Sequence, residues 1–301
     1  MLKNNRDFLF LFDATCANPN GDPDQENKPR FDYETKTLLV SDVRRKRDIR
    51  DFLAHKGKAI FVHTLNDKKV TMETMLEAVL KQYEVPKNAS SEDKVKVILD
   101  HMLDIRMFGS AMAVGNITTT FTGPIQITWG YSLHPVDMVK SSSIVTIMND
   151  DNSTFGKMYK VHYALVAHGG SMNKFAAQKT HLTEEDADLM PRALVQSMMN
   201  NLTHSKQGQQ PLLYLEILYQ EDFDGYLGDL RRFMQTSIHK ETGIRALADL
   251  TVDFSALNTS IEQLQEKGYI KTVRLWKSPL ATSFLHLPAG EELDLLLPIQ
   301  E

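Results

Sequence analysis

The sequence has few of the features that mark secreted, membrane or metal-binding proteins. It contains one cysteine in 301 residues, Cys16, which excludes a disulfide within the chain and a multi-cysteine zinc site. We expect Cys16 to be a buried, small apolar side chain. No apolar run approaches the roughly 20 residues of a membrane-spanning helix. The apolar run near Met1 is too short for a signal peptide, and an acidic residue follows it too early. The expectation is a cytoplasmic protein without membrane contact.

Motifs of common enzyme classes are also missing. The sequence has no G-x-x-x-x-G-K-[ST], G-x-G-x-x-G, H-E-x-x-H or G-x-S-x-G, and its ten histidines show no metal-ligand spacing. Asp22, Asp24 and Glu26 suggest a calcium loop, but Asn27 stands where such a loop needs glycine and Tyr33 where it needs glutamate. We therefore predict a protein that is not an enzyme and holds no metal or cofactor.

Positive charge is not in excess overall, but it is concentrated in one segment. The formal net charge is −5, unlike that of many strongly basic nucleic-acid-binding domains. Residues 42–58 nevertheless hold seven Lys or Arg and three Asp, whereas residues 285–301 hold four acids and no Lys or Arg. Such a distribution suits a subunit that binds nucleic acid on one face and partner proteins on others.

The basic segment has the periodicity of a helix. We predict this helix over Asp42–Lys56, with the Ser41 hydroxyl as its N-terminal cap. At about 100° per residue, Ile49, Phe52 and Leu53 share one arc, which should face a core.

Two interpretations of the charged positions on this helix stay open. The pairs Arg44–Asp48 and Arg47–Asp51, each worth roughly 0.2–0.5 kcal/mol, would make a solvated face laced with ion pairs. Alternatively, Lys46, Arg47 and Arg50 contact an RNA or DNA backbone. Lys46 and Arg50 have no acidic residue four positions further on, which predicts that they are freer to bind phosphate.

A second candidate contact is the segment from Ser205 to Pro211. Gly208 would let the backbone approach a ligand closely. Lys206 could meet a phosphate, and the amides of Gln209 and Gln210 could donate to phosphate or sugar oxygens. A plain turn between a helix and a strand explains the same residues equally well.

The order of predicted elements gives an α+β fold. Without its insertions this order is β-α-β followed by β-α-β, as in ferredoxin-like and RNA-recognition folds. Thr183 and Asp186 resemble a capping pair, Pro191 should kink or restart the helix that follows, and Ser255 should cap the last helix. The predicted strands are Asp7–Ala14, Ala59–Val62, Ile125–Trp129, Tyr159–Leu165, Leu213–Tyr219 and Tyr269–Trp276, and further helices are predicted at Thr71–Tyr83, Ser91–Met102 and Ala256–Lys267.

Five segments together resemble one family. They are ANPNGDPD at 17–24, SDVRRKRDIRD at 41–51, DIRMFGSAMA at 104–113, TGPIQITWGYSLHPV at 122–136 and SKQGQQPLLYLEILY at 205–219. This set is similar to the backbone subunit of type I CRISPR effector complexes (Cascade), the Cas-seven family of the RAMP superfamily, and is nearest to subtype I-B. The resemblance extends at least from Arg6 to Tyr219, and the first segments and the TGPIQITWG run are specific in combination.

The resemblance implies a ferredoxin-like (RNA-recognition-motif-like) palm and a set of RNA contacts. The palm would be a single elaborated domain over 1–301, with inserted fingers at about 66–105 and a thumb and hairpin region at 106–157. The thumb would come from 106–122 or from 137–157, with Met107, Phe108 or Met112 as a wedge between bases. The predicted RNA-binding residues are Ser41, Arg44, Arg45, Lys46, Arg47, Arg50, Lys206, Gln209 and Gln210.

The resulting hypothesis is a CRISPR RNA-binding scaffold. By resemblance, copies would polymerise head to tail along the guide beside other Cascade subunits, and target DNA would be read by base pairing with the guide. One alternative is a metal-dependent endonuclease of target RNA that uses Asp22 or Asp24, by analogy with type III backbone subunits. Another is an assembly adaptor without RNA contact, which requires the basic helix to be buried in protein.

Overall fold

A large sheet organises the computed structural model, which describes residues 1–114, 117–140, 143–145, 155–240 and 242–300. Within these residues the sheet has nine strands in the order β18-β16-β13-β1-β12-β9-β5-β4, with β8 also paired to β12. Neighbours are antiparallel except β16 and β18. The strands are β1 (Arg6–Ala17), β4 (Phe31–Asp32), β5 (Thr37–Val40), β8 (Ile125–Ile127), β9 (Gly130–Ser132), β12 (Val161–Met172), β13 (Gln209–Tyr219), β16 (Ile270–Lys277) and β18 (Glu291–Glu292).

Strand β1 lies at the centre of the sheet and separates two cores. Phe8, Phe10 and Phe12 point into the core on one face, and Leu9 and Leu11 point into the core on the other. Alternate side chains of a strand point to opposite faces, so a strand covered on both sides has an unbroken apolar run. This explains why the sequence FLFLF lacks the alternation of a half-exposed strand.

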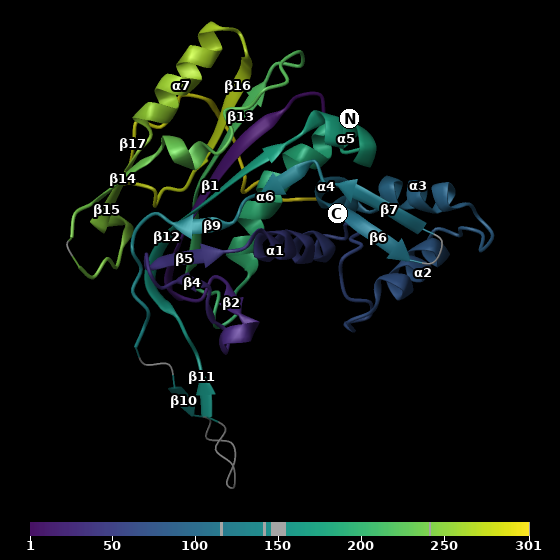
Figure 1. Cartoon of the computed structure of the whole chain (residues 1–301), viewed down its shortest axis with the longest axis horizontal. Helices are drawn as coiled ribbons and strands as arrows, with labels where there is room; N and C mark the ends of the chain where they lie inside the picture. Colours follow the sequence, from purple (N-terminus) through teal and green to yellow (C-terminus); the bar gives the residue numbers. More distant parts are fainter. Residues whose placement is uncertain (115–116, 141–142, 146–154, 241, 301) are drawn as a thin grey trace.

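Helices α1 (Asp42–His55), α5 (Lys174–Thr180) and α6 (Glu184–Asn200) cover the first face, and α1 and α6 are in contact (Figure 1). The predicted capping box is confirmed, since the Thr183 side chain accepts from the Asp186 N–H and the Asp186 side chain accepts from the Thr183 N–H. Helix α6 continues through Pro191 and does not restart there.

The second face is covered by α7 (Ser255–Glu266) and a small sheet of β14 (Gln235–Ile238), β15 (Leu250–Asp253) and β17 (Phe284–Leu285). Two short 3-10 helices, η2 (Leu230–Phe233) and η3 (Leu247–Asp249), join this layer. The prediction that Ser255 caps α7 is wrong by one position. Phe254 is the N-cap, and the Ser255 hydroxyl instead donates to Asp253.

A third unit lies at the right of Figure 1 and has its own core. It contains α2 (Met72–Gln82), α3 (Ser91–His101), α4 (Leu103–Phe108) and the hairpin of β6 (Gly109–Val114) and β7 (Ile117–Thr122). The predicted strand Ala59–Val62 is wrong, because the N–H groups of Phe61 and Val62 donate to the Asp104 carboxylate instead of a neighbouring strand.

Two more hairpins complete the described chain. Strands β2 (Gly21–Asp22) and β3 (Lys28–Pro29) flank the short helix η1 (Pro23–Gln25) in the segment between β1 and β4, residues 18–30, which we call the first loop. Strands β10 (Ser143–Val145) and β11 (Phe155–Lys157) form a hairpin that projects away from the main sheet at the bottom of Figure 1. Residues 115–116, 141–142 and 146–154 of the predicted thumb and hairpin region lie outside the described residues.

A buried ionic cluster joins β1, β13 and β16 to α6. Glu216, with a fully buried side chain, accepts hydrogen bonds from Arg274 and, at 3.4 Å, from Arg6. Arg6 is 1% exposed and also pairs with Glu184 and Asp188. These carboxylates raise the pKa of Arg6 despite its burial, and the two arginines lower the pKa of Asp188. The buried Arg6 guanidinium is therefore held in the ionised form by its carboxylate neighbours.

Asp13 gives a pH-dependent prediction for stability. Burial raises the pKa of Asp13 to about 6, against a smaller opposing effect of the Tyr163 hydroxyl, which donates to it at 3.2 Å. Between about pH 4 and 6 the folded chain keeps this proton and the unfolded chain loses it, so the Asp13 contribution to stability falls as pH rises through that window.

Asp13→Asn should therefore become more stable relative to the wild type between pH 4 and pH 7, by an amount on the order of 2 kcal/mol. Urea unfolding of both proteins at several pH values measures the difference, and comparison within the pair removes the effect of other acids. A difference that stays constant with pH would contradict the raised pKa.

Candidate nucleic-acid interface

The first loop fixes the start of α1. The Ser41 hydroxyl accepts from the Arg44 N–H, which confirms the predicted cap. Both the N–H and the hydroxyl of Ser41 donate to Asn20 Oδ1 at 2.8 Å. Ser41 is itself buried, so it shapes the helix end rather than presenting a free hydroxyl.

The outward side of α1 carries three cations, each paired with a carboxylate. Lys46 Nζ lies 3.0 Å from Asp42, one turn before it in the helix. Arg47 Nε donates to Asp51 at 2.7 Å, as predicted. Lys46 and Arg50, expected to be freer because no acid lies four positions further on, are paired as well, and Arg50 Nε donates at 2.9 Å to a buried Asp104 carboxylate from α4. Arg47, with 44% of its side chain exposed, is the most accessible of these three cations.

Phe108 supports this surface from below. Its ring centroid lies 5.8 Å from Lys46 Nζ and 5.1 Å from Arg50 Cζ, within the range of cation–π attraction. Phe108, Met107 and Met112 are all buried in the described structure. Their apolar side chains are enclosed in the cores beside α4, so the described structure gives no support to the prediction that one of them is a wedge between bases.

Arg45 and Lys206 are structural cations, contrary to the prediction that they contact RNA. Arg45 is 1% exposed and its guanidinium lies 5.1 Å from the Phe12 ring, beneath α1. Lys206 Nζ donates to the carbonyls of Asn18 and Pro19, at 2.5 and 2.8 Å, and so fixes the first loop. Arg44 is partly exposed and pairs with Asp48, the other ion pair predicted from spacing.

Arg44, Arg45 and Lys206 lie close enough to influence one another's ionisation. Burial, with a smaller effect of Arg44, lowers the pKa of Arg45 to about 9. Burial, with smaller effects of Arg44 and Arg45, lowers the pKa of Lys206 to about 7. Close positive charges disfavour one another, and a bound anion would relieve that repulsion.

The Ser205–Pro211 segment forms a tight turn into β13. A Cβ at Gly208 would lie 2.4 Å from the Thr15 carbonyl, and its φ of +103° favours glycine. Gln209 is buried and its amide donates to the Lys206 carbonyl at 3.2 Å, so the prediction that it contacts RNA is wrong. Gln210 is half-buried. The structural interpretation of this segment fits better than a direct ligand contact.

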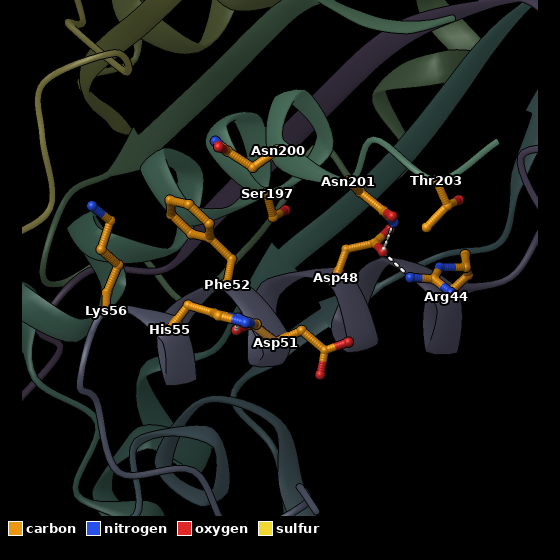
Figure 2. A pocket seen from close by; sticks show the side chains of 10 residues that line it. All are labelled: Arg44, Asp48, Asp51, Phe52, His55, Lys56, Ser197, Asn200, Asn201 and Thr203. Atoms are coloured by element: carbon orange, nitrogen blue, oxygen red, sulfur yellow. Dashed lines mark hydrogen bonds and ion pairs between the residues drawn. The ribbon is translucent and has the colours of Figure 1, made fainter. Parts of the chain in front are cut away.

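A groove of about 630 Å³ lies between α1 and the C-terminal end of α6 (Figure 2). Asp48 lies within it and accepts from Arg44 and, at 2.7 Å, from the Asn201 amide. Since acids and cations both line this groove, its charge does not select strongly for an anion. The lining residues are Arg44, Asp48, Asp51, Phe52, His55, Lys56, Ser197, Asn200, Asn201 and Thr203.

The first-loop acids have local roles. Asp22 accepts from the Asp24 N–H at 3.2 Å and lies 3.4 Å from Arg30. Asp24 is exposed. No group of three or more His, Cys, Asp or Glu suited to a metal ion occurs among the described residues. Cys16 is exposed, with a φ of 48°, so the prediction of a buried cysteine is wrong: the end of β1 leaves it outside the core.

Comparison with known proteins identifies the family. Residues 4–255 match the family described as CRISPR-associated protein Cas7. The chain belongs to the Cas7 family. It is also 25% identical over 288 residues to the CRISPR-associated protein Cas7 of Haloferax volcanii, a match that covers 88% of this chain and 84% of that relative. The family resemblance of the sequence is thus confirmed, and subtype I-B stays a prediction.

The fold of this Cas7-family chain is similar to that of a chain in a solved structure. A chain of a CRISPR RNA-guided surveillance complex in a pre-nicking state is similar with a TM-score of 0.55 and 12% identity, covering 96% of both chains. A chain of another CRISPR RNA-guided surveillance complex has a TM-score of 0.47 and 14% identity, covering 96% of this chain and 94% of that one. The first match confirms an α+β fold built on a large central sheet.

Three residues of this Cas7-family surface were not predicted from the sequence. Asn20 anchors the helix cap, Asp104 binds Arg50, and Trp129 is 47% exposed close to the start of α1. Asn20, Asp104 and Trp129 all belong to the segments that carry the family resemblance, and that resemblance was the only sequence feature that could have pointed to them.

None of the helices in the described part of the chain has both the length and the apolar character that a membrane crossing requires.

Proposed function

We propose that this chain is a guide-RNA-binding backbone subunit of a type I CRISPR interference complex. The observation that carries the proposal is the outward face of α1, where Lys46, Arg47 and Arg50 stand together in a chain of the Cas7 family. Arg47, 44% exposed, can exchange its surface ion pair with Asp51, worth about 0–1 kcal/mol, for a phosphate contact, and Lys46 and Arg50 add positive charge beside it.

The palm of this subunit is ferredoxin-like. Four adjacent strands, β13-β1-β12-β9, with α1 and α6 on one face, have the order expected for two β-α-β units. The helical unit around α2 and α3 is the fingers. The β6–β7 hairpin packs on that unit through Met112 and Ile117, so the projecting β10–β11 hairpin is the better candidate for the thumb.

Copies of the subunit assemble head to tail along the guide and meet other Cascade subunits at the ends. A heterologous interface that does not close into a ring leaves open ends, which other subunits can cap. Target DNA is then recognised by base pairing with the guide, and the protein holds the backbone. Neither holding the guide backbone nor base pairing between guide and target requires a catalytic residue in the chain.

A binding and cleavage assay separates the three candidate functions. The purified chain is incubated with a labelled single-stranded guide RNA, complementary RNA or DNA, and Mg²⁺ or Mn²⁺. We expect the guide to be bound and every strand to remain intact. Cuts that disappear in Asp22→Ala or Asp24→Ala would establish the endonuclease instead, and a folded protein that binds no RNA would support the adaptor.

A further inference from the structure

The TGPIQITWG segment is explained by packing except at Trp129. Thr128 Oγ1 accepts from the Gly169 N–H at 3.0 Å and donates to the Gly169 carbonyl at 2.9 Å. A Cβ at Gly130 would lie 2.6 Å from His168 Nε2, so only glycine fits there. Trp129, between them, leaves 47% of its surface exposed. The indole of Trp129 is therefore a large aromatic face, open to a ligand, in a segment whose neighbouring residues are packed.

The backbone that carries Trp129 is held rigidly. Arg231 Nη1 donates to the Trp129 carbonyl at 2.6 Å, and the same guanidinium donates twice to Asp229 at 2.8 Å. Arg231 also lies 4.3 Å from the centroid of the Tyr131 ring and is itself buried. The indole is therefore presented from a fixed platform, and little conformational entropy is lost when a ligand contacts it.

A cation accompanies the indole. The Arg30 guanidinium lies 5.9 Å from the centroid of the Trp129 ring, and its side chain is 30% exposed. Arg30 follows the first loop, where its N–H donates to the Asn20 carbonyl. Asn20 in turn holds Ser41, so the backbone of Arg30 is connected through Asn20 to the start of α1.

The strand register places this pair beside the basic helix. Val40, the residue before the Ser41 cap, pairs with Gly130, the residue after Trp129. The backbone of Trp129 is thus close in the sheet to the chain that enters α1, the helix proposed to bind phosphates. Proteins that bind single-stranded nucleic acids combine an exposed aromatic face with a guanidinium, as Trp129 and Arg30 do, and stack bases on the aromatic beside a bound backbone.

We infer that Trp129, together with Arg30, is a stacking platform for one unpaired base of the guide RNA. This inference rests on the proposed function and extends it from the phosphate backbone to a base. Stacking on an aromatic face tolerates every base, since each has a π-face, so such a contact suits a scaffold that does not read sequence. Arg231 is the positioning residue that fixes the platform.

Tryptophan fluorescence tests the contact directly. The sequence has two tryptophans, and the other, Trp276, is 7% exposed. Titrating the full chain with a single-stranded RNA should quench the Trp129 emission. Trp129→Phe should abolish the quenching while keeping most of the affinity, because phenylalanine still stacks. Trp129→Ala should lower the affinity by about 5- to 100-fold without changing the salt dependence, because the indole touches no phosphate.

The chain offers a matched control for this experiment. Like Trp129, Phe175 is an exposed aromatic residue with a cation near its ring: it is 49% exposed, and Lys174 Nζ lies 5.2 Å from the ring centroid. It lies on α5, however, and is not part of the proposed platform. Phe175→Ala should bind RNA as the wild type does. Quenching that persists in Trp129→Phe, or wild-type affinity in a folded Trp129→Ala, would overturn the platform while leaving backbone binding in place. A wild type that binds no RNA would instead overturn the proposed function itself.

Discussion

Replacing both Lys46 and Arg47 with glutamate is expected to weaken binding of single-stranded RNA by at least about 100-fold, because each change sets a negative charge against phosphate, at a cost of several kcal/mol. The fold should survive, since the ion pairs lost to Asp42 and Asp51 are i, i+4 pairs within one helix, worth only tenths of a kcal/mol each. Fluorescence anisotropy at several salt concentrations measures the affinity and the number of phosphate contacts.

The control for this variant reverses two charges elsewhere. Lys267 follows α7 and Lys277 ends β16, and both side chains are exposed. Lys267→Glu with Lys277→Glu changes the net charge equally and should leave RNA affinity within a few-fold of the wild type. Equal losses in the two double variants would mean that overall charge, and not the α1 surface, governs binding. Arg50 is left unchanged, because a glutamate there would face the buried Asp104.

Glu216→Gln is expected to destabilise the fold by about 3–5 kcal/mol, since it removes the one fully buried counter-charge that Arg6 and the partly buried Arg274 share in the described structure. For a chain of this size the melting temperature should fall by roughly 5–15 °C. Thermal unfolding followed by circular dichroism, or differential scanning calorimetry, measures the loss.

Asp188→Asn is the matched control within the same ionic cluster. Asp188 also pairs with Arg6 and Arg274, but its side chain is 45% exposed, so water can replace the lost contact. The variant should lose much less stability than Glu216→Gln. If the two variants melted at the same temperature, burial of Glu216 would not be what makes the cluster stabilising.

The parts of α1 that could be predicted from the sequence depend on local spacing. The Ser41 cap and the inward positions of Ile49 and Leu53 follow from helix periodicity and are confirmed. The pairs Arg44–Asp48 and Arg47–Asp51 follow from i, i+4 spacing and are confirmed as well. Local rules succeed here because each partner lies within about one helical turn.

The errors concern contacts made across the fold. Arg50 meets Asp104, 54 positions away in the sequence, and no local pattern signals that pairing. The Asp104 carboxylate also accepts hydrogen bonds from the N–H groups of Phe61 and Val62. The short apolar run that contains these two residues is therefore irregular and does not form the predicted strand. Arg45 and Lys206 looked like free cations, but packing against β1 and the first loop buries them. Burial depends on tertiary packing, which side-chain chemistry alone does not determine.

The measurement that tests the scaffold most directly is the size of the particle formed on RNAs of increasing length. A subunit that follows the RNA backbone should add copies in proportion to RNA length, and since the free chain carries a net charge of −5, RNA should bridge like-charged copies. Sedimentation velocity with a series of single-stranded RNAs should show particles that grow with each increment, whatever the RNA sequence. One closed oligomer of fixed size, the same with every RNA and without RNA, would contradict the account.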